Sequence, residues 1–359
     1  MLLPVLLACA GTGVPTDTSA DTGACACSTT DACCDGCAPE PGPSACDDGT
    51  AATWAACTTG ACATGGVLST YPLGEGVWAH AVAVAPSGVV VVAAEDALGG
   101  TGGRAGVFGP DGAAVLTRDG PYTGADLSPD GVVAALCGGA LELVDAATGA
   151  FIPTDAACAG GAVSWSPDGA SIAAAIPEGA RVSDATGAAR FDVAHARNPD
   201  ARLWAIVWSP DGSRFATATG QAGFGSPKGE VKLWSAVDGA PLGELECTAM
   251  DLAWSADGAR LAAACWNDVR VWDTSTYERL HTLPSGLPVL SVEWVGERLA
   301  IGALESGVRV IDLDTGADVL ALGDEAGFGS PKDLDFGAFG LAAALWDAPG
   351  GALWSDLPL

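Results

Sequence analysis

The sequence predicts an all-β fold, a seven-bladed β-propeller over residues 67–359, preceded by a small disulfide-rich segment. Three observations predict this fold. A turn phrase recurs about every 42 residues, short apolar or small-residue runs flank each copy, and one spare β-like run precedes the first copy. A repeat of this length with several short strands per unit is typical of a propeller blade.

The turn phrase marks the connection between the first two strands of each unit. The full copies are "LSPDG", "WSPDG", "WSPDG" and "WSADG", which begin at Leu127, Trp165, Trp208 and Trp254. A divergent copy, "APSG" from Ala85, comes first. Two more divergent copies, "EWVGERLA" from Glu293 and "DFGAFGLA" from Asp335, come last. Successive copies are spaced by 43, 38, 43, 46, about 40 and about 42 residues, so seven turns predict seven blades.

Each unit follows the same order of strands. An apolar strand precedes the turn, as in "AIVWSPDG", and a small-residue strand follows it, as in "RLAAAC" from Arg260. A third strand ends in Asp and a glycine turn, as in "LELVDAATG", and an outer strand such as "ERLHTL" completes the unit. The strands lack a clean alternation of apolar and polar residues because both faces of a blade pack on neighbours.

These units resemble the WD-repeat family over roughly Val67–Leu359. Trp272-Asp273 is a full signature dipeptide at its proper place. Partial versions are Trp234-Ser235, Val144-Asp145, Ser183-Asp184 and Ile311-Asp312. The family's glycine–histidine pair is essentially absent, since the histidines of the chain are His80, His195 and His281. The sequence therefore gives no basis for the buried hydrogen-bond network that the family builds from that histidine.

The two ends of the repeat region complement each other. The last unit supplies three strands before Leu359, and the run "VLSTYPL" at Val67–Leu73 stands ahead of the first unit. We expect that run to pair with the last blade, because pairing would close the ring and remove an open sheet edge.

The N-terminus begins with a short apolar run, "MLLPVLLAC". Its last four residues, Leu6–Cys9, resemble the lipobox of bacterial lipoproteins. That resemblance implies a signal over residues 1–8, lipidation of Cys9, and export to the cell envelope, with Ala10 favouring the outer membrane. No positive charge precedes the run and it is short for a secretory core, which a misplaced start codon would explain. A cleaved ordinary signal, which leaves the protein periplasmic or extracellular, and no export at all are the alternatives.

Two segments separate this run from the repeats. Residues 9–24 are small, polar and poor in apolar residues, which predicts a flexible tether. Residues 25–66 carry eight cysteines: Cys25, Cys27, Cys33, Cys34, Cys37, Cys46, Cys57 and Cys62. This segment resembles short cysteine-rich modules near the start of exported proteins in some predatory and soil bacteria. It is too short for an adequate core, so we expect disulfides of unresolved connectivity, with zinc bound at the Cys34–Cys37 pair as the alternative.

Charge limits the classes of partner. Asp and Glu number 44 against 15 Lys and Arg, so a nucleic-acid partner is excluded for lack of a basic face. No apolar run reaches the ~18 residues that span a membrane, so we expect membrane contact only through the N-terminal lipid. We further expect a monomer that needs no cofactor.

One peptide, "AGFGSPK", occurs twice, at Ala222–Lys228 and Ala326–Lys332. Both copies lie in connections that leave the same side of the predicted disc, because neighbouring strands alternate in direction. We expect an exposed binding rim there, since aromatic rings beside cations are common interface anchors. The candidate binding residues are Phe224, Lys228, Phe328, Lys332, Glu95, Asp96, His195 and Arg202. The alternative is that recombination in repetitive DNA copied a loop without a function.

Three carboxylates, Asp126, Glu293 and Asp335, share one position of the predicted inner strands, which line the central channel. They are weak candidates for cation binding or for acid–base chemistry. The alternative is that these carboxylates have no chemical role and are solvated or hydrogen-bonded to the backbone.

Four cysteines in the repeat region lie at strand ends that point to the same side of the disc. We expect disulfides Cys247–Cys265 and Cys137–Cys158. A nucleophilic thiol is not expected, because no histidine lies close to these cysteines in the sequence.

Together these features predict a non-enzymatic, surface-tethered propeller that binds a protein, peptide or glycan through its loop-rich face. The alternatives are an exported hydrolase that uses the channel carboxylates and a purely structural envelope protein, since propellers host all three roles.

Overall fold

The computed structural model describes residues 44–46, 53–58, 61–97, 102–195, 202–220, 229–322, 330–345, 350–355 and 357. Before Ser69 we describe the backbone alone. The described residues are all-β, with antiparallel sheets and no helix. Accordingly, these ranges hold no helix of the length and apolarity that crossing a membrane requires.

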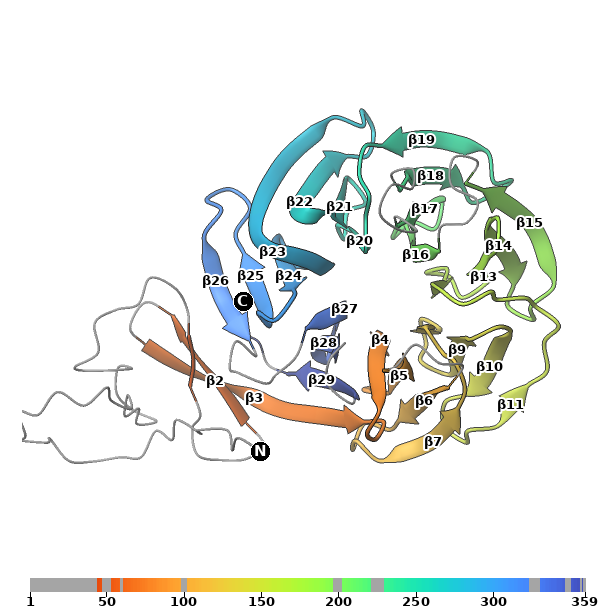
Figure 1. Ribbon diagram of the computed structural model, residues 1–359, viewed down its shortest axis with the longest axis horizontal. Helices are drawn as coiled ribbons and strands as arrows, with labels where there is room; N and C mark the ends of the chain where they lie inside the picture. The colour runs from red at the N-terminus through yellow and green to blue at the C-terminus, as the bar shows by residue number, and fades with distance from the viewer. Residues whose placement is uncertain are drawn as a thin grey trace, which may run out of the picture.

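Four sheets have four strands each, and in all four the strands follow one another outward from the axis in chain order (Figure 1). The first comprises β4 (Val77–Val84), β5 (Val90–Asp96), β6 (Gly103–Phe108) and β7 (Ala114–Asp119). The second comprises β8 (Gly124–Leu127), β9 (Val133–Cys137), β10 (Leu141–Asp145) and β11 (Phe151–Ile152). The third comprises β12 (Val163–Trp165), β13 (Ser171–Ile176), β14 (Gly179–Asp184) and β15 (Ala189–Ala194). The fourth comprises β16 (Leu203–Trp208), β17 (Arg214–Thr219), β18 (Val231–Ser235) and β19 (Pro241–Leu245).

A seven-stranded sheet follows, and it folds at one long strand. Its strands are β20 (Leu252–Trp254), β21 (Arg260–Ala264), β22 (Trp266–Asp273), β23 (Arg279–Val295), β24 (Arg298–Ala303), β25 (Val308–Ile311) and β26 (Asp318–Leu322). The first part of β23 pairs with β22, and its last part, from Val289, pairs with β24. The 17-residue β23 thus serves as the outer strand of one four-stranded array and the inner strand of the next.

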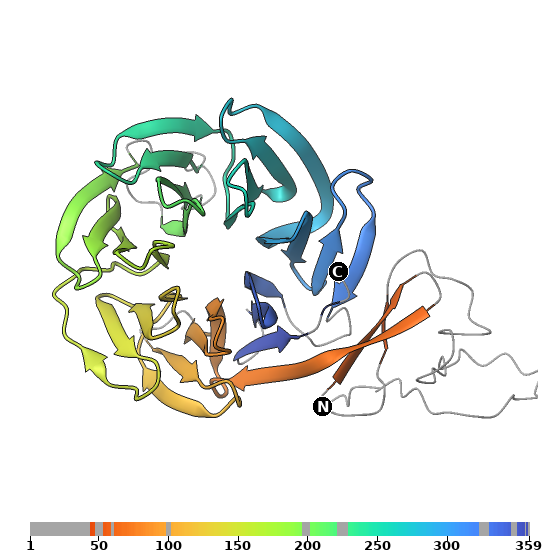
Figure 2. The same cartoon turned by 180° about the vertical axis from the view of Figure 1, so that it is seen from behind.

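The sixth sheet joins the two ends of the chain. Its strands are β1 (Ser44–Cys46), β2 (Thr53–Thr58), β3 (Ala61–Pro72), β27 (Pro331–Gly337), β28 (Gly340–Leu345) and β29 (Gly350–Trp354). Strand β3 pairs with β29 in a register that places Leu68 opposite Trp354. Figures 1 and 2 show β3 running from a peripheral hairpin to the outer side of β29.

The sheets stand side by side around a central axis (Figure 1). Small side chains allow them to pack closely: one buried cluster joins Ala93 and Val91 of the first sheet to Ala134 and Leu136 of the second. Such two-sided burial explains why the second strands are rich in Ala and Val, since each face of a sheet contacts a neighbour.

The recurrent turn phrase has a clear physical basis. In each full copy the Ser hydroxyl donates to the Asp carboxylate at 2.6 Å and accepts a hydrogen bond from the N–H five residues after the Ser. The glycine has a φ between 66° and 69°, which favours a residue without Cβ. The phrase therefore fixes a tight, self-capped turn at the end of an inner strand.

Tryptophans of the turn phrase connect neighbouring sheets. The indole N–H of Trp208 donates to the Ser164 carbonyl at 3.2 Å, and that of Trp254 donates to the Val207 carbonyl at 3.2 Å. Trp294 continues the series with a 3.1 Å bond to the Ala253 carbonyl. Each tryptophan thus satisfies a carbonyl of the preceding inner strand as well as filling the core.

Candidate binding site in the central channel

The inner strands surround a cavity of about 190 Å³ on the central axis. Its polar lining is arranged in three tiers along those strands. We name the tiers by their place along the strand direction. The tier at the start of the inner strands, called the mouth, holds His80, Thr123, Trp204, Met250 and Lys332; the next tier holds Asp251 and Asp333; the last tier along the strands, called the deepest, holds Asp126, Ser164, Glu293 and Asp335. The members of each tier occupy equivalent positions of different inner strands. On β27 the three tiers are Lys332, Asp333 and Asp335, so the first two lie three and two residues before the last.

β-bulges bring three mouth residues into the channel. The ladder between β4 and β5 skips His80, that between β16 and β17 skips Trp204, and that between β27 and β28 skips Lys332. A bulged residue is released from strict alternation, so its side chain can be re-aimed toward the axis. The same device therefore builds the mouth on three separate sheets.

The mouth concentrates cations around one aromatic ring. Lys332 Nζ lies 4.9 Å from the centre of the Trp204 ring, and the guanidinium carbon of Arg202 lies 4.9 Å from it. Arg202 also lies 3.7 Å from a carboxylate oxygen of Glu95, whose other oxygen lies 2.9 Å from His80 Nε2. Gly220 makes room for the indole, since a Cβ there would collide with Trp204 Nε1.

The charge states at the mouth follow from these contacts. Burial lowers the pKa of His80, and the contact with His80 lowers the pKa of Glu95. Burial is also the main cause of the lowered pKa of Lys332, which Asp251 and Asp333 partly oppose. Lys332 is 6% exposed, so it is a buried cation that faces a cavity.

Below the mouth, carboxylates join neighbouring inner strands. Asp126 accepts a 2.7 Å bond from Trp165 N–H, and Asp251 accepts a 2.9 Å bond from Val292 N–H. Asp333 and Asp335 of β27 accept bonds of 2.9 and 2.6 Å from the N–H groups of Val82 and Val84 on β4. These side chains thus satisfy backbone donors on the open edge of the next inner strand.

The walls of the channel raise the pKa of every one of these carboxyl groups. The pKa of Asp126 rises to about 7 and those of Asp251 and Asp335 to about 6, with burial as the largest cause. The pKa values of Glu293 and Asp333 lie well above their usual range, because burial is reinforced by the neighbouring acids. Although the channel leaves part of each side chain accessible, protein surrounds it on all sides, which disfavours the charged form.

The predicted carboxylate triad, Asp126, Glu293 and Asp335, therefore lies in the channel. Within the described ranges, no group of three His, Cys, Asp or Glu side chains is placed to hold a metal ion. Sequence reasoning missed Asp251 and Asp333. Each lies two residues before the aligned position, and the two-residue period of a strand was the available signal.

Three of the candidate rim residues lie close together in the structure, and two of the candidates, Lys332 and His195, are buried and not exposed on a rim. Glu95 pairs with Arg202 beside the Trp204 ring that Lys332 also contacts, but the expectation of an exposed Lys332 is wrong, because it is buried and lines the cavity. His195 is 2% exposed and is also not on a rim. Asp96 ends β5. Phe224, Lys228 and Phe328 lie outside the described residues, as do Cys9, Cys25, Cys27, Cys33, Cys34 and Cys37.

His195 instead belongs to a buried network in the fourth sheet. Its Nε2 lies 2.8 Å from Thr217 Oγ1, and its Nδ1 lies 3.2 Å from Glu230 Oε2. Trp234 Nε1 donates to the same Thr217 oxygen at 2.7 Å, and Lys232 Nζ lies 2.9 Å from Glu230 Oε2. Burial lowers the pKa of His195 to about 4, so the imidazole is neutral at physiological pH.

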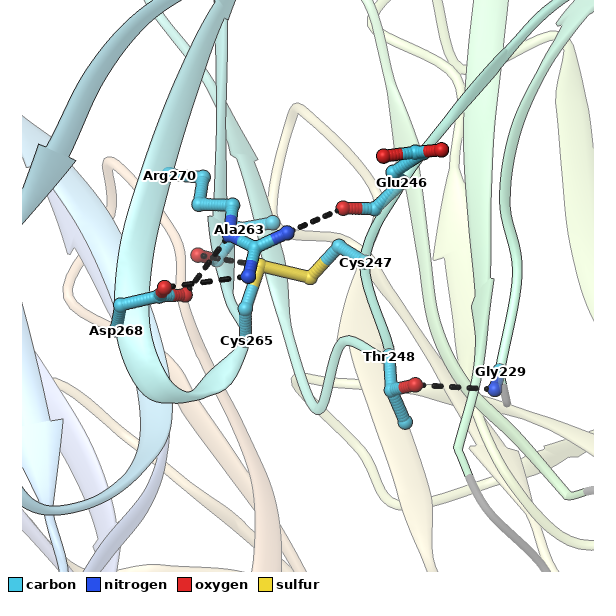
Figure 3. Close-up of a disulfide and its surroundings, with 8 residues drawn as sticks. All are labelled: Gly229, Glu246, Cys247, Thr248, Ala263, Cys265, Asp268 and Arg270. Atoms are coloured by element: carbon cyan, nitrogen blue, oxygen red, sulfur yellow. Dashed lines mark hydrogen bonds and ion pairs between the residues drawn. A yellow bond between two sulfur atoms is a disulfide. The ribbon is translucent and has the colours of Figure 1, made fainter. Parts of the chain in front are cut away.

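Both disulfides predicted for the repeat region are present. Cys137–Cys158 and Cys247–Cys265 have Cα separations of 5.5 and 5.6 Å. Figure 3 shows the surroundings of the second: Arg270 donates to the Glu246 carbonyl at 2.6 Å and to Asp268. In the N-terminal segment, Cys46, Cys57 and Cys62 lie on β1, β2 and β3, with Cys57 opposite Cys62 in the backbone register.

The residue after Cys265 has an unusual conformation. Trp266 has a φ of 65°, in the left-handed region that disfavours side chains, and it is 47% exposed. It is the first residue of β22 and directly follows Cys265 of the Cys247–Cys265 disulfide. Tyr277 and Glu305 share this left-handed φ, at 61° and 55°, and backbone strain of this kind is often found at functional positions.

Comparisons with known proteins add no relative: no protein-family model matches the chain, and a search of curated proteins finds no similar sequence.

Proposed function

We propose that the chain is a seven-bladed β-propeller of WD-repeat type, tethered at the cell envelope, which binds a protein, peptide or glycan without catalysing a reaction. The seven-stranded sheet counts as two blades that share β23, and β27, β28, β29 and β3 count as the last blade. The network around His195 supports the family resemblance, because the family builds a buried network from a histidine. The Leu6–Cys9 motif supports the tether.

The binding surface that we propose is the loop face, defined as the side from which connections after second and after fourth strands leave the sheets. Because strands alternate in direction, these connections share one side. The loop face includes Trp266, both disulfides, Gly229, which directly follows the first repeated peptide, and Ser330 of the second.

One observation carries the proposal: Trp266 keeps a left-handed backbone and 47% exposure beside a disulfide. Such a conformation costs roughly 1–2 kcal/mol for a residue with a Cβ, and exposure forgoes the burial of a large ring. Tryptophan, with tyrosine and arginine, is also enriched at the energetic centre of interfaces. A partner that covers the ring explains both features.

Capture from a cell-envelope extract tests this proposal, with the retained species identified by mass spectrometry. We expect the parent chain to retain a partner and Trp266→Ser to lose it. Val237→Ser is the matched control, since Val237 is 87% exposed but lies in the turn between β18 and β19 on the opposite side. Equal capture by the parent and Trp266→Ser would contradict the role of this residue.

A hydrolase is the second candidate function, and one observation favours it. The pKa of Asp126 at about 7 suits a general acid or base, and Asp335 lies close enough to influence it. If the channel is catalytic, Asp126→Asn and Asp335→Asn abolish turnover of a hydrolysable substrate while circular dichroism and the melting temperature are kept.

A further inference from the structure

The channel has two chemically different ends. Lys332 provides a cation at the mouth, supported by Arg202 nearby. The deepest tier provides three carboxyl groups whose raised pKa values leave them partly protonated near neutral pH, so a bound ammonium would favour their charged form. Lys332 lowers the pKa values of the middle tier, Asp251 and Asp333. Among the described lining residues the deepest tier has no cation, while the mouth has two cations, Lys332 and Arg202, beside one acid, Glu95.

Lys332 is the observation that points to a ligand rather than to an acidic wall alone. It is 94% buried and faces the cavity, and its described contact is the Trp204 ring. Among the described residues, no oxygen lies within hydrogen-bond or ion-pair range of Nζ. A buried ammonium without an oxygen partner is costly, so an incoming anionic group would gain a strong charge-assisted bond.

Size and spacing limit what can enter. The cavity of about 190 Å³ exceeds the roughly 150 Å³ that suffices for benzene. Lys332 and Asp335 are three residues apart on β27, which corresponds to roughly 10 Å along an extended strand. A molecule with one charge at each end of a short chain can span this interval.

We propose that the central channel binds a small zwitterion, with its carboxylate at Lys332 and its ammonium among Asp126, Glu293 and Asp335. This inference goes beyond the proposed function, because the ligand is small and enters the channel instead of covering Trp266. Trp204 forms one wall of the entrance and shields the carboxylate–lysine contact from solvent, which strengthens that contact.

Isothermal titration calorimetry on the full chain tests the proposal with three probes of one shape. Glycylglycine carries both charges, glycylglycinamide lacks the carboxylate, and N-acetylglycine lacks the ammonium. We expect glycylglycine to bind roughly tenfold more tightly than either analogue, since each loses one charged contact. Equal affinity of glycylglycine and an analogue, or no heat from any probe up to about 50 mM, would overturn the proposal.

Variants assign the two ends. Lys332→Met should weaken glycylglycine roughly tenfold and leave glycylglycinamide within about twofold, whereas Lys332→Arg should keep most of the affinity. Arg181→Met is the matched control, because it removes one positive charge from an ion pair with Asp192 outside the channel. If Lys332→Met fails to fold, the comparison of probes on the parent chain still decides.

The outcomes separate this inference from the proposed function. Trp266→Ser should leave glycylglycine binding unchanged. A chain that binds no zwitterion but still captures its partner overturns only the channel site.

Discussion

At the scale of residues, the Thr217 hydroxyl forms hydrogen bonds with two buried side chains, Trp234 and His195. Its hydroxyl oxygen accepts from Trp234 Nε1, which leaves its proton for His195 Nε2. The Nδ1 proton of the imidazole then goes to Glu230, so one hydroxyl sets the orientation of three side chains. Thr217 is completely buried, and no solvent can replace it.

Thr217→Val should therefore lower the free energy of unfolding by about 3 kcal/mol, because it leaves two buried ring nitrogens without a partner. Urea denaturation measures the change. Thr117→Val is the control: Thr117 is exposed on β7, and its replacement should change stability by less than about 0.5 kcal/mol. A similar result for both variants would mean that the network contributes little.

Asp126 gives the stability of the protein a pH dependence of defined sign. Its pKa is about 7 in the folded state and lower when unfolded, so the folded state binds more protons between these values. The stability linked to this group is thus present at low pH and lost as pH rises through about 7. His195 has the opposite effect, because its pKa is about 4 in the folded state and about 6.5 when unfolded, so the stability linked to it falls as pH drops below about 6.5.

Between about pH 6.5 and about pH 8 the parent chain should lose roughly 1 kcal/mol more stability than Asp126→Asn. Urea denaturation at both pH values measures this difference. Because each protein is compared with itself at the two pH values, any pH-independent effect of the Asn side chain on stability cancels. If the two proteins respond equally to pH, Asp126 does not titrate in this interval. Asp211→Asn is a suitable control, since Ser209 holds the pKa of that turn carboxylate at about 2.

At the scale of elements, the Cys247–Cys265 disulfide ties the connection before β20 to the connection after β21. It closes a loop of 18 residues. The neighbouring Thr248 hydroxyl accepts a 3.1 Å bond from Gly229 N–H, directly after the first repeated peptide (Figure 3). The cross-link therefore stabilises a region of the loop face that extends over two sheets.

A Cys247→Ala, Cys265→Ala double variant should lose about 3 kcal/mol of unfolding free energy, because a loop of this length gains entropy in the unfolded chain. Thermal and urea denaturation under oxidising conditions measure the loss, with the Cys137–Cys158 disulfide intact in both proteins. Reducing agent should destabilise the parent chain further, since it opens both bridges. Unchanged stability of the double variant would show that packing alone holds the connection.

Strands and disulfides of the repeat region were predictable from sequence because their causes are local. The Ser-Pro-Asp-Gly turns cap themselves, and cysteines at equivalent strand ends meet whenever strands alternate. The mouth of the channel was not predictable in this way. Bulges at His80, Trp204 and Lys332 depend on pairing with the second strand, and the sequence carries no separate mark for them.

At the scale of the whole molecule, the chain closes on itself by two kinds of contact. Asp333 and Asp335 bind the backbone of β4, although 251 residues separate each donor from its acceptor. Strand β3 covers β29, which would otherwise be an open edge. One contact joins the inner strands and the other completes the outer side, so the first and last sheets depend on each other.

Removal of β3 tests how much the pairing of β3 with β29 contributes to the stability and the monomeric state of the protein. A chain that begins at residue 75 exposes the backbone donors and acceptors of β29, and an unpaired edge promotes association with other chains. We expect it to elute as oligomers in size-exclusion chromatography with light scattering, whereas a control chain that begins at residue 44 keeps β1, β2 and β3 and stays monomeric. The acidic surface, with a net charge of −29, opposes association, so oligomers would show that edge pairing outweighs charge repulsion. If the shorter chain stays monomeric and equally stable, the carboxylate contacts of β27 with β4 are sufficient to close the molecule.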